Sequence, residues 1–213
     1  IGMNQSATPY HHGDLRNCAI IAAAELIENI GSYDITIAQV AKRVGVSPPA
    51  LYRHFKDKDA LLTAVRELAH IGIMEYTTNA QESVAPGTLT HIDALGSAYL
   101  RFAMDKKAFF GLMWENHGAA DERRAEARAK RTGFQVLHEA IELYLRKQRP
   151  ESVETSLQTA TLLWSAAHGI ATLQHNRLLD AFDHDADAEA MLRTATRAIL
   201  NVNVSVGALD STR

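Results

Sequence analysis

The sequence predicts an all-α protein in which a small N-terminal three-helix unit precedes a larger helical bundle. Three observations support this fold class. Apolar residues recur every three or four positions along nearly the whole chain, no segment alternates in the manner of a strand for long, and glycine or proline ends the periodic stretches. With 213 residues, of which 46% are hydrophobic and 22% charged, the chain has a globular composition and can bury a core. About nine helices account for the pattern.

Local signals delimit the first two helices. An apolar stripe over residues 15–30 predicts one face of a helix, which Gly31 ends. Thr36 begins a second, shorter helix, and Gln39 three residues later has the spacing of a capping box. Gly45 breaks this second helix and leaves a tight turn before the next one.

The third helix is short. Ser47 stands at its expected N-cap, and Pro48 and Pro49 suit its first turn, where a missing N–H group costs little. We expect this helix to end near Phe55. The apolar residues expected in the core of the three-helix unit are Val40, Val44, Leu51 and Phe55.

A longer fourth helix is predicted after the polar connection at residues 56–58, and residues 82–88, which contain Pro86-Gly87, form the clearest break in the chain. The longest run without a charged residue, 155–176, contains several polar side chains and is interpreted as a buried helix rather than a membrane span. Beyond the break, helical segments are predicted over residues 88–105, 106–116, 121–148, 152–177 and 186–204.

Positive charge is concentrated in one short segment of an otherwise acidic protein. The chain has 22 Lys and Arg against 25 Asp and Glu, a formal charge of −3. Between residues 36 and 58 there are five basic residues and one acidic residue, Asp57, so the segment carries 5 − 1 = +4. Two short helices joined through a glycine turn form a helix-turn-helix, whose second helix can enter a DNA major groove. The five basic residues are Lys42, Arg43, Arg53, Lys56 and Lys58.

Residues 47–62 resemble the helix-turn-helix signature of the TetR family of transcriptional regulators, and residues 10–16 resemble the N-terminal arm of one branch of that family. The features that match are Gly45, Leu51-Tyr52, His54-Phe55, Lys58 and Leu61-Leu62. The resemblance implies phosphate contacts at Thr36, Tyr52, His54 and Lys58. It also implies two domains, a helix-turn-helix DNA-binding domain over residues 10–58 and a ligand-binding and dimerisation domain over residues 59–206.

Base reading is expected to depend mainly on one side chain. Pro48, Pro49 and Ala50 occupy positions where family members often carry polar side chains, and none of the three can donate a side-chain hydrogen bond. Arg53 can pair bidentately with guanine, while Pro48 and Ala50 can contact thymine methyl groups. The DNA-binding residues predicted from the motif are Thr36, Ser47, Pro48, Ala50, Tyr52, Arg53, His54 and Lys58.

The segment around Trp164, His168 and Gly169 resembles the Trp-His-Gly signature of one C-terminal class of the TetR family. Apolar and small residues on this segment and on the last helix are expected to form a four-helix interface between two copies of the chain. The alternative is that these faces pack inside one subunit. The predicted interface residues are Trp164, His168, Ala171, Ala195 and Ile199.

Aromatic and methionine side chains cluster in the two segments that follow residue 88. Such clusters are commonly core, but they also build apolar pockets, and the family resemblance implies a small-molecule effector. The predicted ligand-binding residues are Phe102, Phe109, Met113, Trp114, His117 and His138.

Several other functions are disfavoured by the sequence. The single cysteine, Cys18, excludes an intrachain disulfide and a multi-cysteine zinc site. His138-Glu139 begins a zinc-protease pattern that Glu142 fails to complete, and neither a phosphate-binding glycine loop nor a serine-hydrolase elbow is present. We expect a cytoplasmic, non-enzymatic homodimer without metal, cofactor or membrane span. It would bind a palindromic operator as a regulator, a repressor in preference to an activator, and a small apolar or amphipathic ligand would modulate it. The alternative is an all-α ligand-binding protein or enzyme whose helix-turn-helix is structural.

Overall fold

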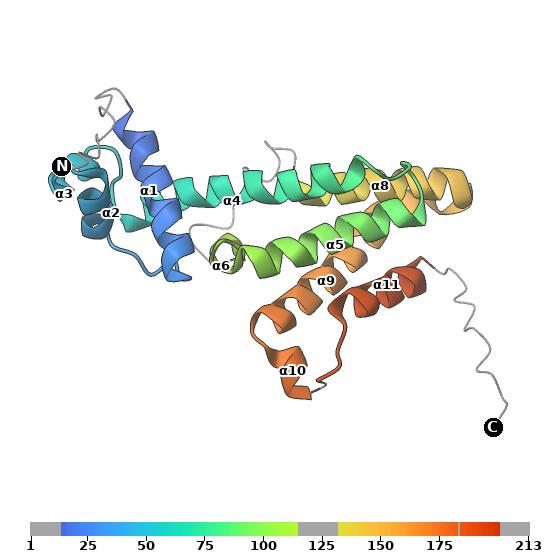
Figure 1. Ribbon diagram of the computed structural model, residues 1–213. Coiled ribbons are helices and arrows are strands. Elements are labelled where there is room, and N and C mark those ends of the chain that lie inside the picture. Colours follow the sequence, from blue (N-terminus) through green and yellow to red (C-terminus); the bar gives the residue numbers. More distant parts are fainter. Residues whose placement is uncertain (1–13, 115–131, 183, 201–213) are drawn as a thin grey trace, which may run out of the picture.

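The computed structural model describes residues 14–114, 132–182 and 184–200 and confirms the predicted all-α class. Within these residues there are ten α-helices, one 3₁₀ helix and no strand. Figure 1 shows an elongated molecule in which the long helix α4 (Lys58–Gln81) joins a small group of helices at one end to a larger bundle.

The small group consists of α1 (Leu15–Ile30), α2 (Ile37–Val44) and α3 (Pro48–Tyr52), packed around the start of α4. We call α1–α3 together with the first two turns of α4 the head. Its hydrophobic core contains the fully buried side chains of Val40, Leu51 and Val65, and Phe55 is 2% exposed. Val44 is half-buried against the same core, so the expected core residues of this unit are confirmed.

The ends of the first two helices are set by the residues that the sequence indicated. Gly31 and Gly45 follow α1 and α2 with φ of 69° and 80°, left-handed values that a side chain would disfavour. At the start of α2, the Thr36 hydroxyl accepts a hydrogen bond from the Gln39 N–H, and the Gln39 side chain accepts one from the Thr36 N–H. The predicted capping box is therefore confirmed.

The connection between α3 and α4 differs from the prediction. Helix α3 has five residues and ends at Tyr52, and the Ser47 side chain makes no capping hydrogen bond at its N-terminus. Asp57, expected in a polar connection, caps α4 by accepting a hydrogen bond of 2.8 Å from the Ala60 N–H. The chain therefore turns from α3 into α4 through a short segment in which Phe55 is buried.

The bundle contains the remainder of α4 and the helices that follow it. Helix α9 packs against α5, α8 and α11, and α5 also packs along α4. No described helix combines the length and apolar character needed to cross a membrane, and the uncharged run falls on α9. The further elements are α5 (Leu89–Asp105), α6 (Lys107–Trp114), α8 (Gly133–Gln148), the 3₁₀ helix η1 (Pro150–Thr155), α9 (Ser156–His175), α10 (Leu178–Phe182) and α11 (Ala188–Ile199).

The prediction of one continuous helix over residues 121–148 is wrong at Thr132. This residue is extended, with φ of −105° and ψ of 161°, and its hydroxyl accepts a hydrogen bond from the Gln135 N–H. The two residues form a second capping box that begins α8, and the helix cannot pass through it. Residues 121–131 lie outside the described part of the chain.

The core of the head extends beyond the domain boundary proposed at residue 58. It includes Leu61 and Val65 of α4, and Ala108 and Leu112 of α6. Helices α4 and α6 therefore contribute residues to the core of the head and to the core of the bundle. A displacement of either helix inside the bundle would also move residues of the head core.

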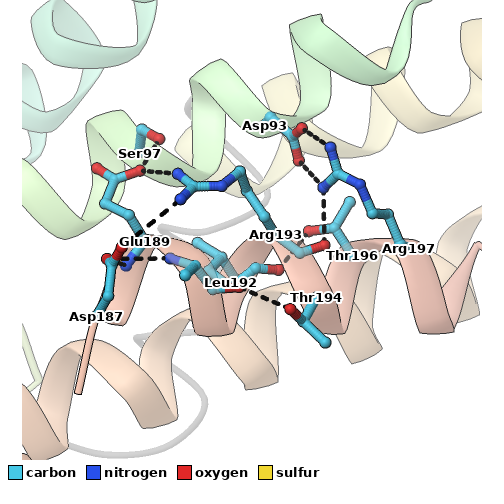
Figure 2. Close-up of polar contacts among 10 residues, drawn as sticks. Asp93, Ser97, Asp187, Glu189, Leu192, Arg193, Thr194, Thr196 and Arg197 are labelled. Atoms are coloured by element: carbon cyan, nitrogen blue, oxygen red, sulfur yellow. Dashed lines mark hydrogen bonds and ion pairs between the residues drawn. The ribbon is translucent and has the colours of Figure 1, made fainter. Parts of the chain in front are cut away.

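Polar contacts hold α11 against α5 (Figure 2). The guanidinium of Arg197 contacts the carboxylate of Asp93 at 3.0 Å, and both side chains are largely shielded from solvent. Ser97 of α5 donates a hydrogen bond to Glu189, which also pairs with Arg193 at 3.5 Å. These contacts fix one side of α11.

Candidate functional site

The predicted DNA-contacting residues lie at the surface of the head, around α3 and the start of α2. Tyr52 is 54% exposed. Its neighbours Arg53 and His54 are also exposed, as are Thr36, Ser47 and Pro48, whereas Ala50 and Lys58 are half-buried. Because Leu51 of α3 and Phe55 just after it are buried in the head core, the segment 48–55 presents one apolar side inward and a mixed aromatic and cationic side outward.

Ion pairs within the head occupy some of its cations. Arg43 contacts Glu25 at 2.7 Å, and the Lys58 ammonium contacts the Asp34 carboxylate at 3.1 Å. Arg53 makes no ion pair with any residue of the described ranges. Such exposed pairs contribute little to stability, so a phosphate group can compete with Asp34 for Lys58.

A cavity of about 230 Å³ lies within the bundle, between α4, α5, α6, α8, α9 and α11. Its walls include Leu95 of α5, Met113 and Trp114 of α6, Phe134 of α8 and Trp164 of α9. Most of the exposed wall is apolar, as in small-molecule binding sites generally.

Three of the six predicted ligand-binding residues are described by the structure and do not line this cavity. Phe102 points from α5 towards α4, where its ring meets Tyr76 edge-on with centroids 5.4 Å apart. Phe109 packs between the head core and the bundle core, and His138 is hydrogen-bonded to the Ser156 hydroxyl at 3.1 Å. His117 lies outside the described residues. Met113 and Trp114 do line the cavity.

The predicted interface residues on α9 lie on the side of that helix that packs on other helices of the same chain. Trp164 lines the cavity, Ala171 is fully buried, and the His168 ring stacks on Trp164 with centroids 5.8 Å apart. The stripe of these residues marks the inner face of α9, which packs on α5 and α11. On α11, Ala195 and Ile199 are half-buried. The outer face of α9 carries Leu162 and Leu173.

A hydrogen bond of 2.9 Å joins the Tyr99 hydroxyl to Nδ1 of His168 beside the cavity. Burial raises the pKa of Tyr99, an effect that the indoles of Trp164 and Trp114 only partly oppose, so the phenol stays protonated. Burial lowers the pKa of His168 below its ordinary value of 6.5, which favours the neutral imidazole. Tyr99 was not among the predicted ligand-binding residues, because periodicity does not tell which of Tyr99 and Phe102, about one turn apart on the same helix, faces a cavity.

The lowered pKa of His168 predicts a loss of stability in mild acid. As the pH falls through about 6.5, the unfolded chain takes up a proton that the folded chain resists, so the free energy of unfolding decreases towards pH 5. His91 acts in the same direction, because burial also lowers its pKa. The variant His168→Gln keeps a hydrogen-bonding side chain but does not titrate, so its denaturation free energy should fall less steeply between about pH 7 and pH 5. An unchanged slope would contradict this role of His168.

Within residues 14–114, 132–182 and 184–200, no three His, Cys, Asp or Glu side chains gather in a group that could hold a metal ion.

Comparisons with solved structures show the fold. A protein of unknown function from Rhodococcus sp. RHA1 superposes with a TM-score of 0.68 at 24% identity, covering 92% of this chain and 98% of that one. SmeT, the repressor of the multidrug efflux pump SmeDEF of Stenotrophomonas maltophilia, has been solved in complex with triclosan. That complex matches with a TM-score of 0.54 at 18% identity, over 90% of this chain and 92% of SmeT.

Comparisons with sequences point to one family. Tetracycline repressor protein class C of Escherichia coli is 46% identical over 52 residues, so the match spans 24% of this chain and 24% of that relative's length. The family model described as bacterial regulatory proteins of the tetR family matches residues 20–65. The model described as a tetracyclin repressor-like C-terminal domain matches residues 92–199, about half of the chain. The chain therefore belongs to the TetR family.

Proposed function

We propose that the protein is a homodimeric transcriptional repressor that binds a palindromic operator through the head and is modulated by a small apolar or amphipathic ligand in the cavity. The observation that carries this proposal is the division of the segment 48–55 between a buried side and an exposed side. Leu51 and Phe55 anchor it, while Tyr52, Arg53 and His54 are free to meet DNA. The +4 charge of the segment 36–58 supplies the attraction to phosphate.

A second copy of the chain is the proposed partner of the outer face of α9. Leu162 and Leu173 are 52% and 39% exposed, and a Cβ added at Gly169 between them would meet nothing within 4 Å. An apolar face with a small residue at its middle suits close helix packing across a two-fold axis. A dimer would also present two heads to the two halves of a palindrome.

Helix α6 is the proposed link between ligand and head. Its residues Ala108 and Leu112 belong to the head core, while Met113 and Trp114 line the cavity. The Arg66 side chain of α4 donates a hydrogen bond of 3.0 Å to the Leu112 carbonyl near the end of α6. A ligand that displaces Trp114 would therefore shift α4 and, with it, the spacing of the two heads. The SmeT–triclosan complex supports a ligand at this fold.

The substitution Leu162→Asp tests the proposed dimer. It should convert the dimer to monomer, as measured by analytical ultracentrifugation, because two carboxylates would be buried at the interface. Affinity for a duplex with two half-sites should then fall by about tenfold or more, while affinity for a single half-site stays the same. The operator and its half-site are first identified by selecting tight-binding duplexes from random DNA.

The matched control is Leu68→Asp, which places the same charge on an exposed leucine of α4. This variant should remain dimeric. A Leu162→Asp variant that is folded and still dimeric would rule out the outer face of α9 as the interface.

A further inference from the structure

We propose that the cavity takes an uncharged ligand built around one or two aromatic rings. This inference rests on the proposed function, in which the cavity is the effector site, and adds the chemical class of the effector. It depends on the charge, the hydrogen bonds and the ring content of the cavity wall, together with its volume.

The described wall offers no partner for an ionic ligand. It contains no Asp, Glu, Lys or Arg, and His70 is its one imidazole. Two carboxylates on the neighbouring helices α5 and α11 are already engaged, Asp93 by Arg197 and Glu189 by Ser97 and Arg193. An ion bound against these described wall residues would lose hydration without gaining a counter-charge from them, which disfavours binding.

The hydroxyl groups of the wall are also largely committed. Thr77 donates its hydrogen to the carbonyls of Ile73 and Met74, and Thr196 donates to Leu192. The Tyr99 hydroxyl is bonded to His168. Since these donors are used inside the protein, a ligand gains little from a large polar surface, and its affinity must come mainly from apolar contact.

The remaining wall favours a flat ring. The Trp114 and Trp164 rings lie 5.6 Å apart at 49°, and Phe134 meets Trp164 with centroids 5.9 Å apart at 73°. Tilted and edge-on arrangements of this kind can admit a further aromatic ring at the same spacing. An apolar cavity of roughly 150 Å³ accommodates benzene. The 230 Å³ cavity therefore suits a substituted single ring or a bicyclic ring system.

An aromatic wall can alternatively form a cage for an organic cation. One feature disfavours a cage here: the His168 ring stacks on Trp164 at an interplanar angle of 29°, so one face of this indole is already covered. Cation binding is therefore an outcome that the experiment must be able to detect.

The test uses three probes that share a naphthalene ring and differ in charge: 2-naphthalenemethanol, 2-naphthoate and (2-naphthylmethyl)trimethylammonium. Calorimetry on the full-length protein gives each dissociation constant. Both tryptophans of the chain, Trp114 and Trp164, line the cavity, so a change in their emission locates the bound probe there. The neutral probe should bind at least about tenfold more tightly than either ion.

A pair of variants checks that the cavity is the site. Ala167→Leu adds volume to the wall and should weaken binding of the neutral probe at least about tenfold. Ala94→Leu, on α5 but not in the wall of this cavity, should not weaken it. Thermal melting of both variants shows whether they are folded, and the comparison of the three probes on the unaltered protein needs neither variant.

Tighter binding of the anion or of the cation would overturn the inference, as would binding of the neutral probe that survives Ala167→Leu in a folded protein. The effect of the neutral probe on operator binding is measured separately. If the probe binds in the cavity and operator affinity does not change, the proposed regulatory function fails while the ligand class stands.

Discussion

Replacing Phe55 with alanine should destabilise the head by about 3–5 kcal/mol and abolish operator binding, because it removes a large ring from a closely packed core. Phe55 is 2% exposed, and the Arg16 guanidinium lies 5.5 Å from the centre of its ring, so the variant also loses this cation–π contact. Denaturant unfolding followed by circular dichroism measures the loss of stability, and fluorescence anisotropy measures DNA binding.

Tyr52→Ala is the matched control, because it removes a neighbouring aromatic ring that is 54% exposed. Its stability should stay within about 0.5 kcal/mol of the parent protein, while its operator affinity falls. If Tyr52→Ala cost as much stability as Phe55→Ala, the assignment of an inner and an outer side to the segment 48–55 would be wrong.

Replacing Arg53 with alanine should relax sequence preference by about 1–3 kcal/mol at one base pair of each half-site, the value of a bidentate contact to guanine. Arg53 is exposed and makes no ion pair with the described part of the chain, so it can reach DNA without breaking an internal contact. The measurement is the affinity of parent and variant for the selected operator and for each single-base change in it.

Lys58→Ala provides the contrast. Lys58 must leave Asp34, 3.1 Å away, to reach a phosphate, and phosphate contacts carry no direct sequence information. Its loss should weaken binding to all duplexes about equally. It should also reduce the slope of log affinity against log salt concentration by about one. Equal relaxation of sequence preference by both variants would exclude this division between base reading and phosphate contact.

The head was predictable from sequence because its structure is determined locally. Gly31 and Gly45 take the left-handed conformations that end α1 and α2, and the Thr36–Gln39 spacing produces the cap that it predicts. The same reasoning applied to Thr132 and Gln135 could have found the start of α8, since the two residues have the same spacing and form the same box. The apolar residues before Thr132 continue the helical period, so the sequence was interpreted as one helix and the capping box was overlooked.

The faces of the bundle helices could not be assigned in this way. Periodicity identifies the apolar stripe through Trp164, His168 and Ala171, but it does not say whether that stripe meets the same subunit or a second one. The structure places it inside, against α5 and α11. Phe102 and Tyr99 are both buried on α5, yet only Tyr99 lines the cavity, because their side chains meet different neighbours. These distinctions depend on tertiary packing.

Selection of tight-binding duplexes from random DNA, repeated at two salt concentrations with the size of the protein measured alongside, tests the proposed function most directly. We expect an enriched inverted repeat with half-sites centred roughly 34 Å apart, or a multiple of that, bound by a dimer with a steep salt dependence. A folded dimer, freed of bound small molecules, that enriches no sequence at either salt concentration would contradict it.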